Sequence, residues 1–373
     1  MTEAASPAPA GARMTVDLAA IAANWKALAG LVAGGGHATA AVVKGDGYGT
    51  GLEEAASAFA TAGATTFFVA LPDEGLRLRA AVPDAVIYVL DGLIGTPELY
   101  GRADLRPVLG SWPEIEAWTA FRKAGGTTGA ALHVDTGMNR LGLTLHEALA
   151  LAREERTLRQ LGLDLVISHL ACADTPDNAM NRRQLALFRE VRNQFPGIAA
   201  SLANSAGVFL GPDYHFDLVR PGIALYGGVA VSGVTNPMRP VVTLEARVLA
   251  VREVEEGDSV GYGATEHVKR PTRLAILAIG YADGYHRAAG ASDEKRGAAA
   301  FIRGQRAPLV ARVSMDLIAI DVTKIPGVAA GDWAELFGRH IPVDEVARHA
   351  GTIGYEFLTG LGRRLERRYT GVA

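Results

Sequence analysis

Cysteine is nearly absent from this chain, with Cys172 alone among 373 residues. One cysteine excludes a disulfide within the chain and a metal site built from several thiolates. Long apolar runs are missing as well, since no window approaches the roughly eighteen uncharged apolar residues of a transmembrane helix. No cluster of His, Asp and Glu has metal-ligand spacing, so we expect no bound metal.

Neither sign of charge dominates the sequence. Lys and Arg number 37 against 40 Asp and Glu, a net charge of −3, which argues against a protein that neutralises nucleic-acid phosphates. With 49% hydrophobic and 21% charged residues, the chain resembles an ordinary globular protein and is long enough for two domains. We expect a cytoplasmic protein without nucleic-acid or membrane partners. Residues 1–12 are rich in Ala and Pro, so we predict a disordered tail there rather than a signal peptide.

The first 220 residues alternate short β-rich apolar runs with helical patterns. Eight runs joined by helices predict a (β/α)8 barrel over 13–240, with an open doubly wound sheet as the alternative. The eight runs are TAAVVK ending at Lys44, 66–70, 86–90, 106–110, 131–135, 165–170, 199–204 and 217–222.

The sequence pattern changes after residue 240. Segments such as VVTLEARVLAVREV, RLAILAIG and APLVARVSMDLIAIDVT are strand-like, with few helical patterns between them. We therefore predict a second, mostly β-strand domain over 241–373.

Polar residues of unusual type follow the predicted barrel strands. Because the carboxyl ends of barrel strands meet at one face, these residues should gather there. They are Lys44, His169, Asn204, Ser205 and Arg220. In AVVKGDGYGTG a buried strand ends in a lysine on a glycine-rich loop, which has neither a nucleotide-binding fingerprint nor a phosphate-loop pattern.

A strand-end lysine can form an imine with an aldehyde cofactor such as pyridoxal phosphate (PLP) when its amine is neutral. NSAG at 204–207 and RPGIALYG at 220–227 offer a hydroxyl and backbone N–H groups for a phosphate. Such a lysine is nevertheless more often a surface residue, and a histidine such as His169 is more often structural. The residues alone therefore predict a barrel enzyme with a plausible imine-forming lysine. They leave open the alternative that Lys44 is a surface residue and His169 a structural one.

Nine motifs in order give the sequence a strong resemblance to the PLP-dependent alanine racemase family, from about residue 13 to the C-terminus. They are AVVKGDGYGTG, HVDTGMNRLGL at 133–143, SHLACAD at 168–174, NSAG, VRPGIALYG at 219–227, VGYGATE at 260–266, IGYADGYHR at 279–287, RVSMDLIAIDV at 312–322 and GYEFLTGLGRR at 354–364. The resemblance implies an isomerase that interconverts L- and D-alanine by a two-base mechanism, supplies D-alanine for peptidoglycan and forms a homodimer with shared active sites.

The resemblance also implies a role for each matching residue. Lys44 would hold PLP and act as one base, and Tyr262 from the partner subunit would act as the other. Arg220 would bond the pyridine nitrogen with His169 behind it, and Arg140 would lie near the phenolic oxygen. The phosphate would be held by Tyr48, Asn204, Ser205, Gly222, Ile223 and Tyr355. The substrate would meet Arg140, Met315 and Asp316, with Tyr285 narrowing the entrance.

The sequence departs from the family pattern beside these residues. His133 stands where the family often has a carbamylated lysine that faces the arginine at 140. Histidine forms no such stable carbamate, so we expect another group to orient Arg140. Gly45 and Gly47 replace residues that are commonly alanine or asparagine, which adds backbone freedom beside the lysine.

Three alternatives remain at the level of sequence. The nearest is an amino-acid racemase of broader, serine-type specificity. A related PLP decarboxylase is disfavoured because its glycine-triplet phosphate loop and catalytic cysteine motif are missing. A non-catalytic PLP-binding barrel would not need the 130 further residues that carry Tyr262 and Met315.

Overall fold

The computed structural model describes residues 10–371. They fall into two compact units, which we call the barrel unit (19–239) and the β unit (10–18 with 240–371). Across residues 10–371, no helix has both the length and the apolar character that crossing a bilayer requires.

Parallel strands form the centre of the barrel unit. Many of their side chains are fully buried on both faces, as at Phe67, Phe68 and Val69, which explains why the sequence shows continuous apolar runs rather than alternation. Seven of the strands pair in sequence order, from β3 to β9. The strands are β2 (Ala38–Thr39), β3 (Ala41–Val42), β4 (Thr66–Val69), β5 (Val86–Val89), β6 (Leu105–Leu109), β7 (Ala130–His133), β8 (Leu163–Ile167), β9 (Ala199–Ser201) and β10 (Leu218–Val219).

Strand β10 closes the barrel. It pairs in parallel with β2, which Ala40 alone separates from β3, and the Ala40 N–H donates to the carbonyl of Val219 over 3.0 Å. On its other side, the Arg220 N–H donates to the carbonyl of Ala203 over 2.9 Å, just beyond β9. The eighth strand therefore bridges the first and the seventh, and the predicted (β/α)8 barrel is confirmed over the open doubly wound sheet.

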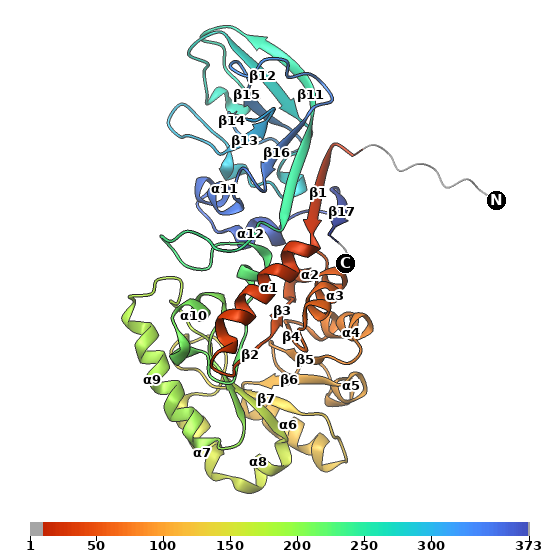
Figure 1. Ribbon diagram of the computed structural model, residues 1–373, viewed down its shortest axis with the longest axis vertical. Helices are drawn as coiled ribbons and strands as arrows, with labels where there is room; N and C mark the ends of the chain where they lie inside the picture. Colours follow the sequence, from red (N-terminus) through yellow and green to blue (C-terminus); the bar gives the residue numbers. More distant parts are fainter. Residues whose placement is uncertain (1–9, 372–373) are drawn as a thin grey trace, which may run out of the picture. The chain divides into compact units, whose positions relative to one another are not determined.

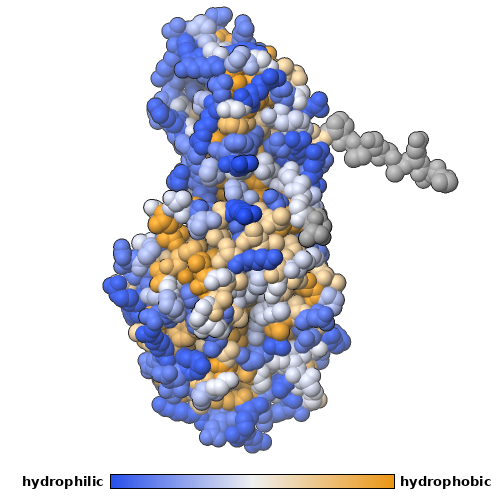
Figure 2. Space-filling model, in the orientation of Figure 1, coloured by the Kyte–Doolittle hydropathy of each residue, from blue (hydrophilic) through white to orange (hydrophobic). Residues whose placement is uncertain are grey.

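Helices surround these strands (Figure 1). Helix α9 is typical: it buries Leu185, Phe188 and Val191 and turns charged residues outward, and Figure 2 shows mostly hydrophilic residues along the outer edge of this unit. The pattern LHEALALAREERTL forms two helices, because the chain breaks at Glu154. The helices are α1 (Leu18–Ala33), α2 (Lys44–Tyr48), α3 (Leu52–Ala62), α4 (Pro72–Ala81), α5 (Pro97–Ala103), α6 (Trp112–Lys123), α7 (Leu145–Arg153), α8 (Glu155–Leu161), α9 (Ala179–Gln194) and α10 (Ser205–Phe209), with short 3₁₀ turns η1 (Pro212–Tyr214) and η2 (Ile223–Tyr226).

The β unit is a mixed sheet with two small helices, in agreement with the predicted β-rich second domain. Its strand order is β12-β15-β14-β13-β16-β11-β1-β17. The strands are β1 (Ala12–Asp17), β11 (Val242–Val254), β12 (Thr272–Leu277), β13 (Ala299–Ile302), β14 (Gln305–Val310), β15 (Ile318–Asp321), β16 (Trp333–Phe337) and β17 (Glu366–Thr370), and the helical segments are α11 (Val343–Ala350), α12 (Gly354–Thr359), η3 (Tyr262–Ala264), η4 (Tyr281–Asp283) and η5 (Arg287–Ala289).

The N-terminal strand differs from the sequence-based expectation. Residues from 13 onward were assigned to the barrel, but β1 lies between β11 and β17, antiparallel to one and parallel to the other. Alternate side chains of β1 are buried, so the strand satisfies its backbone and its apolar face within the β unit. Of the predicted tail, residues 1–9 lie outside the described residues, and Ala12 begins β1.

Candidate active site

A left-handed turn follows Lys44 at the carboxyl end of β3. Lys44 begins α2, and the next three residues have positive φ: 66° at Gly45, 54° at Asp46 and 62° at Gly47. The Gly49 N–H closes the turn on the carbonyl of Gly45 over 2.8 Å. Left-handed backbone strains residues with a Cβ and not glycine, which favours glycine at positions 45 and 47, while Asp46 adopts the same conformation with a Cβ.

The Lys44 side chain is half-buried, and the charges of Arg140 and Arg220 act on it. Burial is the main cause that lowers the pKa of Lys44, and the positive charge of Arg140 adds to it. The carboxylates of Asp91 and Glu74 oppose that shift of the pKa. A lowered pKa leaves more of the amine neutral at neutral pH, which is the form that attacks an aldehyde.

Arg220 is buried at the end of β10 and keeps its charge. Its Nη2 donates to the carbonyl of Ser168 over 2.6 Å, and its Nη1 donates to the hydroxyl of Ser201. Burial lowers the pKa of Arg220 to about 9, so the guanidinium stays protonated at neutral pH. The sequence-based prediction placed His169 behind Arg220; among the described residues Ser168 and Ser201 accept from the guanidinium, and the role of His169 stays a prediction.

Two imidazoles near Arg220 are held neutral. Burial, followed by the charge of Arg220, lowers the pKa of His133 to about 4. The same two causes lower the pKa of His169 well below its ordinary value. The positive charges near these neutral imidazoles belong to Arg220 and Arg140, and an anionic ligand would be stabilised beside them.

Asp135 is a residue that the sequence interpretation missed. Its carboxylate accepts the N–H groups of Gly137 and Met138, each over 2.8 Å, and that of Asn139 over 2.9 Å. These bonds fix the loop that presents the exposed Arg140. Asp135 lies two residues beyond the end of the buried strand β7, and that position was the available signal for it.

An anion cradle lies where Tyr48, α10 and η2 meet. The Ser205 hydroxyl accepts the N–H groups of Gly222 over 2.8 Å and Ala224 over 3.2 Å, beside Ile223 in the same loop. A Cβ added to Gly222 would lie 2.1 Å from the Tyr48 hydroxyl oxygen, so only glycine fits there. Two hydroxyls and a convergent backbone loop suit a phosphate group.

Asn204 stabilises this cradle by capping α10. Its Oδ1 accepts the N–H of Gly207 over 2.9 Å, which caps α10. This cap holds Ser205, the first residue of α10, in place. Lys44, Tyr48, Arg140, His169, Asn204, Ser205, Arg220, Gly222 and Ile223 all belong to the barrel unit. The remaining predicted site residues belong to the β unit.

Tyr262 stands on an exposed turn of the β unit. Gly261 and Gly263 on either side have φ of 73° and 77°, and the tyrosine side chain is 71% exposed. A Cβ on Gly263 would lie 3.0 Å from an Arg312 nitrogen, so the turn packs closely on its own unit while its tyrosine points to solvent.

The two tyrosines of IGYADGYHR occupy opposite environments. Tyr285 is fully buried, with its ring edge-on to that of Phe357 at 5.6 Å between centroids. Tyr281 is 42% exposed, and its N–H donates to the carbonyl of Ser314 over 3.0 Å, beside Met315. In the β unit as described, Tyr281 is therefore the exposed tyrosine of this motif and Tyr285 the buried one.

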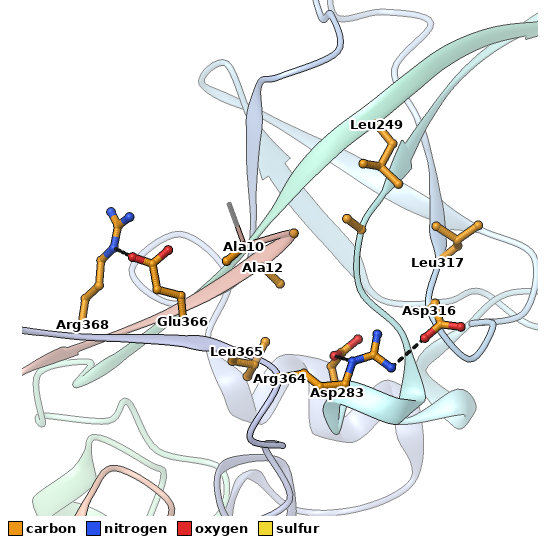
Figure 3. Close-up of a pocket in the computed structure, with 12 residues that line it drawn as sticks. Ala10, Ala12, Leu249, Asp283, Asp316, Leu317, Arg364, Leu365, Glu366 and Arg368 are labelled. Atoms are coloured by element: carbon orange, nitrogen blue, oxygen red, sulfur yellow. Dashed lines mark hydrogen bonds and ion pairs between the residues drawn. The ribbon is translucent and has the colours of Figure 1, made fainter. Parts of the chain in front are cut away.

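Met315 and Asp316 lie on an exposed loop of the β unit. Met315 is 52% exposed, and Asp316 lines a pocket of about 890 Å³. Figure 3 shows the Arg364 guanidinium between Asp316 and Asp283, at 2.8 Å and 3.0 Å from their carboxylate oxygens. Asp316 is thus held by an arginine of its own unit. Tyr355, which was expected at the phosphate, lies in α12.

Comparison with known proteins agrees with this geometry. The family model of the alanine racemase N-terminal domain matches residues 16–230, and that of the alanine racemase C-terminal domain matches residues 241–369. An alanine racemase of Rhizobium meliloti is 51% identical over 98% of both chains, and a biosynthetic alanine racemase of Agrobacterium fabrum is 50% identical over 99% of this chain and 95% of its own.

Solved structures give the same result. The crystal structure of alanine racemase from Bartonella henselae with covalently bound pyridoxal phosphate superposes with a TM-score of 0.91 and 39% identity, over 97% of this chain and all of that one. Both domain models and full-length relatives thus point to one family. The chain belongs to the alanine racemase family.

Proposed function

We propose that Lys44 and Tyr262 are the two bases with which this PLP-dependent member of the family interconverts L- and D-alanine. The observation that carries the proposal is the surroundings of Lys44: a half-buried amine of lowered pKa, beside the basic groups and the anion cradle of one barrel face. When bound, PLP supplies an electron sink for the charge that develops at the substrate Cα.

The residues of the barrel unit fit that cofactor. The Tyr48 hydroxyl and the loop around Gly222 suit its phosphate, and the Gly222 position has no room for a Cβ. Arg220, protonated and already donating to two oxygens, would face the pyridine nitrogen and would not give up its proton to it. Arg140 would meet the phenolic oxygen, held there by the loop that Asp135 orders.

Inversion at Cα needs a proton removed from one face and returned on the other. Lys44 holds or accepts a proton at Nζ, and Tyr262 does so at its hydroxyl oxygen. We propose that Tyr262 comes from the partner subunit of a homodimer. Its 71% exposure supports this, as do the exposed apolar side chains of the same unit, which are Leu249, Tyr281, Met315, Leu317 and Ile353.

The remaining substrate contacts are proposed from the β unit. Met315 and Asp316 would lie near the substrate carboxylate, Arg364 would hold Asp316 in place, and Tyr355 would reach the phosphate. Tyr281 replaces Tyr285 in our proposal for the entrance, since Tyr281 is the exposed tyrosine of the motif. We further propose that the enzyme works in the cytoplasm and supplies D-alanine for peptidoglycan, which its likeness to a relative named biosynthetic supports.

The proposal is tested by loading the purified protein with PLP and measuring loss of optical rotation with each L-amino acid. Alanine should be racemised fastest, and serine much more slowly. Lys44→Ala should lose the absorbance of covalently held cofactor and at least about 1000-fold of the turnover. Racemisation by Lys44→Ala at a rate near that of the unaltered protein would refute the assignment.

A further inference from the structure

One carboxylate grips the backbone immediately after Lys44. Glu74 Oε1 accepts the N–H of Gly45 over 2.6 Å and that of Asp46 over 3.2 Å. Its Oε2 accepts the N–H of Ala70 over 2.9 Å and that of Leu71 over 3.3 Å, at the start of α4. Glu74 therefore joins the lysine turn to the end of the next barrel strand.

The left-handed turn makes this grip possible. Successive backbone N–H groups in a turn can form a concavity that binds an anion, and the N–H groups of Gly45 and Asp46 both point to Glu74 Oε1. Hydrogen bonds to an ionised carboxylate are stronger than those between neutral groups. The same helix adds a side-chain contact, because Arg77 lies 2.8 Å from the Asp46 carboxylate and 2.7 Å from that of Glu53.

The barrel contains a matched construction elsewhere. Glu114, in the first turn of α6, accepts the N–H of Gly110 over 2.8 Å at its own helix start and that of Leu93 over 2.9 Å in the preceding loop. Glu74 and Glu114 are both half-buried and both follow a proline in the helix. They differ in what they hold, since the loop at Leu93 carries none of the proposed site residues.

We propose that Glu74 is a positioning residue for Lys44. By fixing the two N–H groups that follow the lysine, it sets the direction in which the Lys44 side chain leaves the backbone, without contact with the reacting atoms. The proposal rests on the proposed function, because it takes Lys44 to be the residue that holds the cofactor.

The experiment compares Glu74→Gln with Glu114→Gln. Glutamine keeps the shape of the side chain but turns one acceptor oxygen into an amide nitrogen that faces N–H donors. In the protein without PLP, amide hydrogen exchange at Gly45 and Asp46 should be about ten-fold faster in Glu74→Gln. Glu114→Gln should leave exchange at these two amides unchanged and speed exchange at Leu93.

The second readout is attachment of the cofactor. After PLP is added and the protein is treated with borohydride, mass spectrometry measures the fraction of Lys44 that carries the cofactor. That fraction and kcat should fall several-fold in Glu74→Gln, with a smaller change in KM, and should match the unaltered protein in Glu114→Gln.

Two results would overturn the proposal: attachment and kcat unchanged in Glu74→Gln, or an equal fall in both variants, which would mean general destabilisation. An unaltered protein with no cofactor on Lys44 would instead refute the proposed function. In that case unchanged exchange at Gly45 and Asp46 in Glu74→Gln would also refute the grip itself, and accelerated exchange would uphold it.

Discussion

The two turns that carry the proposed bases share left-handed glycines and differ in their surroundings. Lys44 is half-buried in the barrel unit, where burial and Arg140 lower its pKa. Tyr262 is 71% exposed on the β unit. The same type of turn thus carries both residues. The barrel unit buries Lys44 in part and lowers its pKa, whereas the β unit leaves Tyr262 exposed to solvent. We propose that Tyr262, which its turn holds firmly but its own unit leaves exposed, is surrounded only when a partner subunit completes the site.

Carboxylates hold both turns, but they hold them differently. Glu74 accepts N–H groups within the Lys44 turn itself. The Tyr262 turn is held at its far end, where Asp293 accepts the His267 N–H over 3.0 Å and its other oxygen lies 2.8 Å from the His267 Nδ1. The grip on Tyr262 is therefore the more distant one, and its loss should matter less.

Removal of the Tyr262 hydroxyl should cause the largest loss of activity. In Tyr262→Phe, kcat for racemisation should fall at least about 1000-fold, because one face of the substrate has no base. PLP absorbance should stay unchanged, since the barrel unit is intact. In deuterium oxide the variant should still exchange the α-proton of one alanine enantiomer and lose exchange of the other. Equal exchange of both enantiomers would contradict a two-base mechanism.

A methyl group at the phosphate cradle should have the next largest effect. In Gly222→Ala the new Cβ would lie 2.1 Å from the Tyr48 hydroxyl oxygen, so the loop must shift. We expect the Kd for PLP, measured by absorbance titration, to rise about 10- to 100-fold. Gly30→Ala is the matched control, because a Cβ there meets nothing within 4 Å. An unchanged Kd in Gly222→Ala would place the phosphate elsewhere.

Weakening the contact between Asp293 and His267, which holds the Tyr262 turn, should have a smaller effect on kcat. Asp293→Asn weakens an exposed contact with His267, so we expect kcat to fall about three-fold with no change in PLP binding. Steady-state kinetics and absorbance titration measure the two quantities. A loss of PLP binding, or a fall in kcat as large as that of Tyr262→Phe, would show that the turn is not held as described.

Activity at neutral pH should be almost unaffected by added bicarbonate, because the imidazole of His133 forms no stable carbamate.

Stability should depend on pH through His133. Its pKa of about 4 lies below the ordinary 6.5, so below pH 6.5 the unfolded chain gains a proton that the folded chain does not. The folded state should thus lose stability as pH falls from 6.5 to about 4, by up to about 3 kcal/mol. Urea unfolding of His133→Asn should show a weaker pH dependence, and an unchanged dependence would refute this.

Most of the barrel could be predicted from the sequence. Each of the eight apolar runs overlaps a strand, because strands buried on both faces leave a continuous apolar signal. The position of β1 could not be predicted, since six residues of alternating pattern fit either unit until their partners β11 and β17 are known. Local pattern fixes the type of an element, and tertiary pairing fixes its place.

The site divides in the same way. Strand-end residues such as Lys44 and Arg220 could be found, because barrel strands deliver their ends to one face. Glu74 could not, because its carboxylate acts through backbone N–H groups that have no sequence signature. Asp135 had one signal only, its position just after a barrel strand. Tyr285 was expected at the entrance, but the spacing of the motif does not show that Tyr285 is buried while Tyr281, in η4, is exposed. The roles of all these residues stay predictions.

The most direct measurement mixes two nearly inactive variants, Lys44→Ala and Tyr262→Phe, in equal amounts and lets their subunits exchange. If each subunit lends Tyr262 to its partner, about half of the dimers are mixed, and each mixed dimer holds one intact site. About a quarter of all sites should then recover alanine racemisation. Native mass spectrometry confirms that mixed dimers have formed. Confirmed mixed dimers without recovered activity would contradict the shared site and place both bases on one chain.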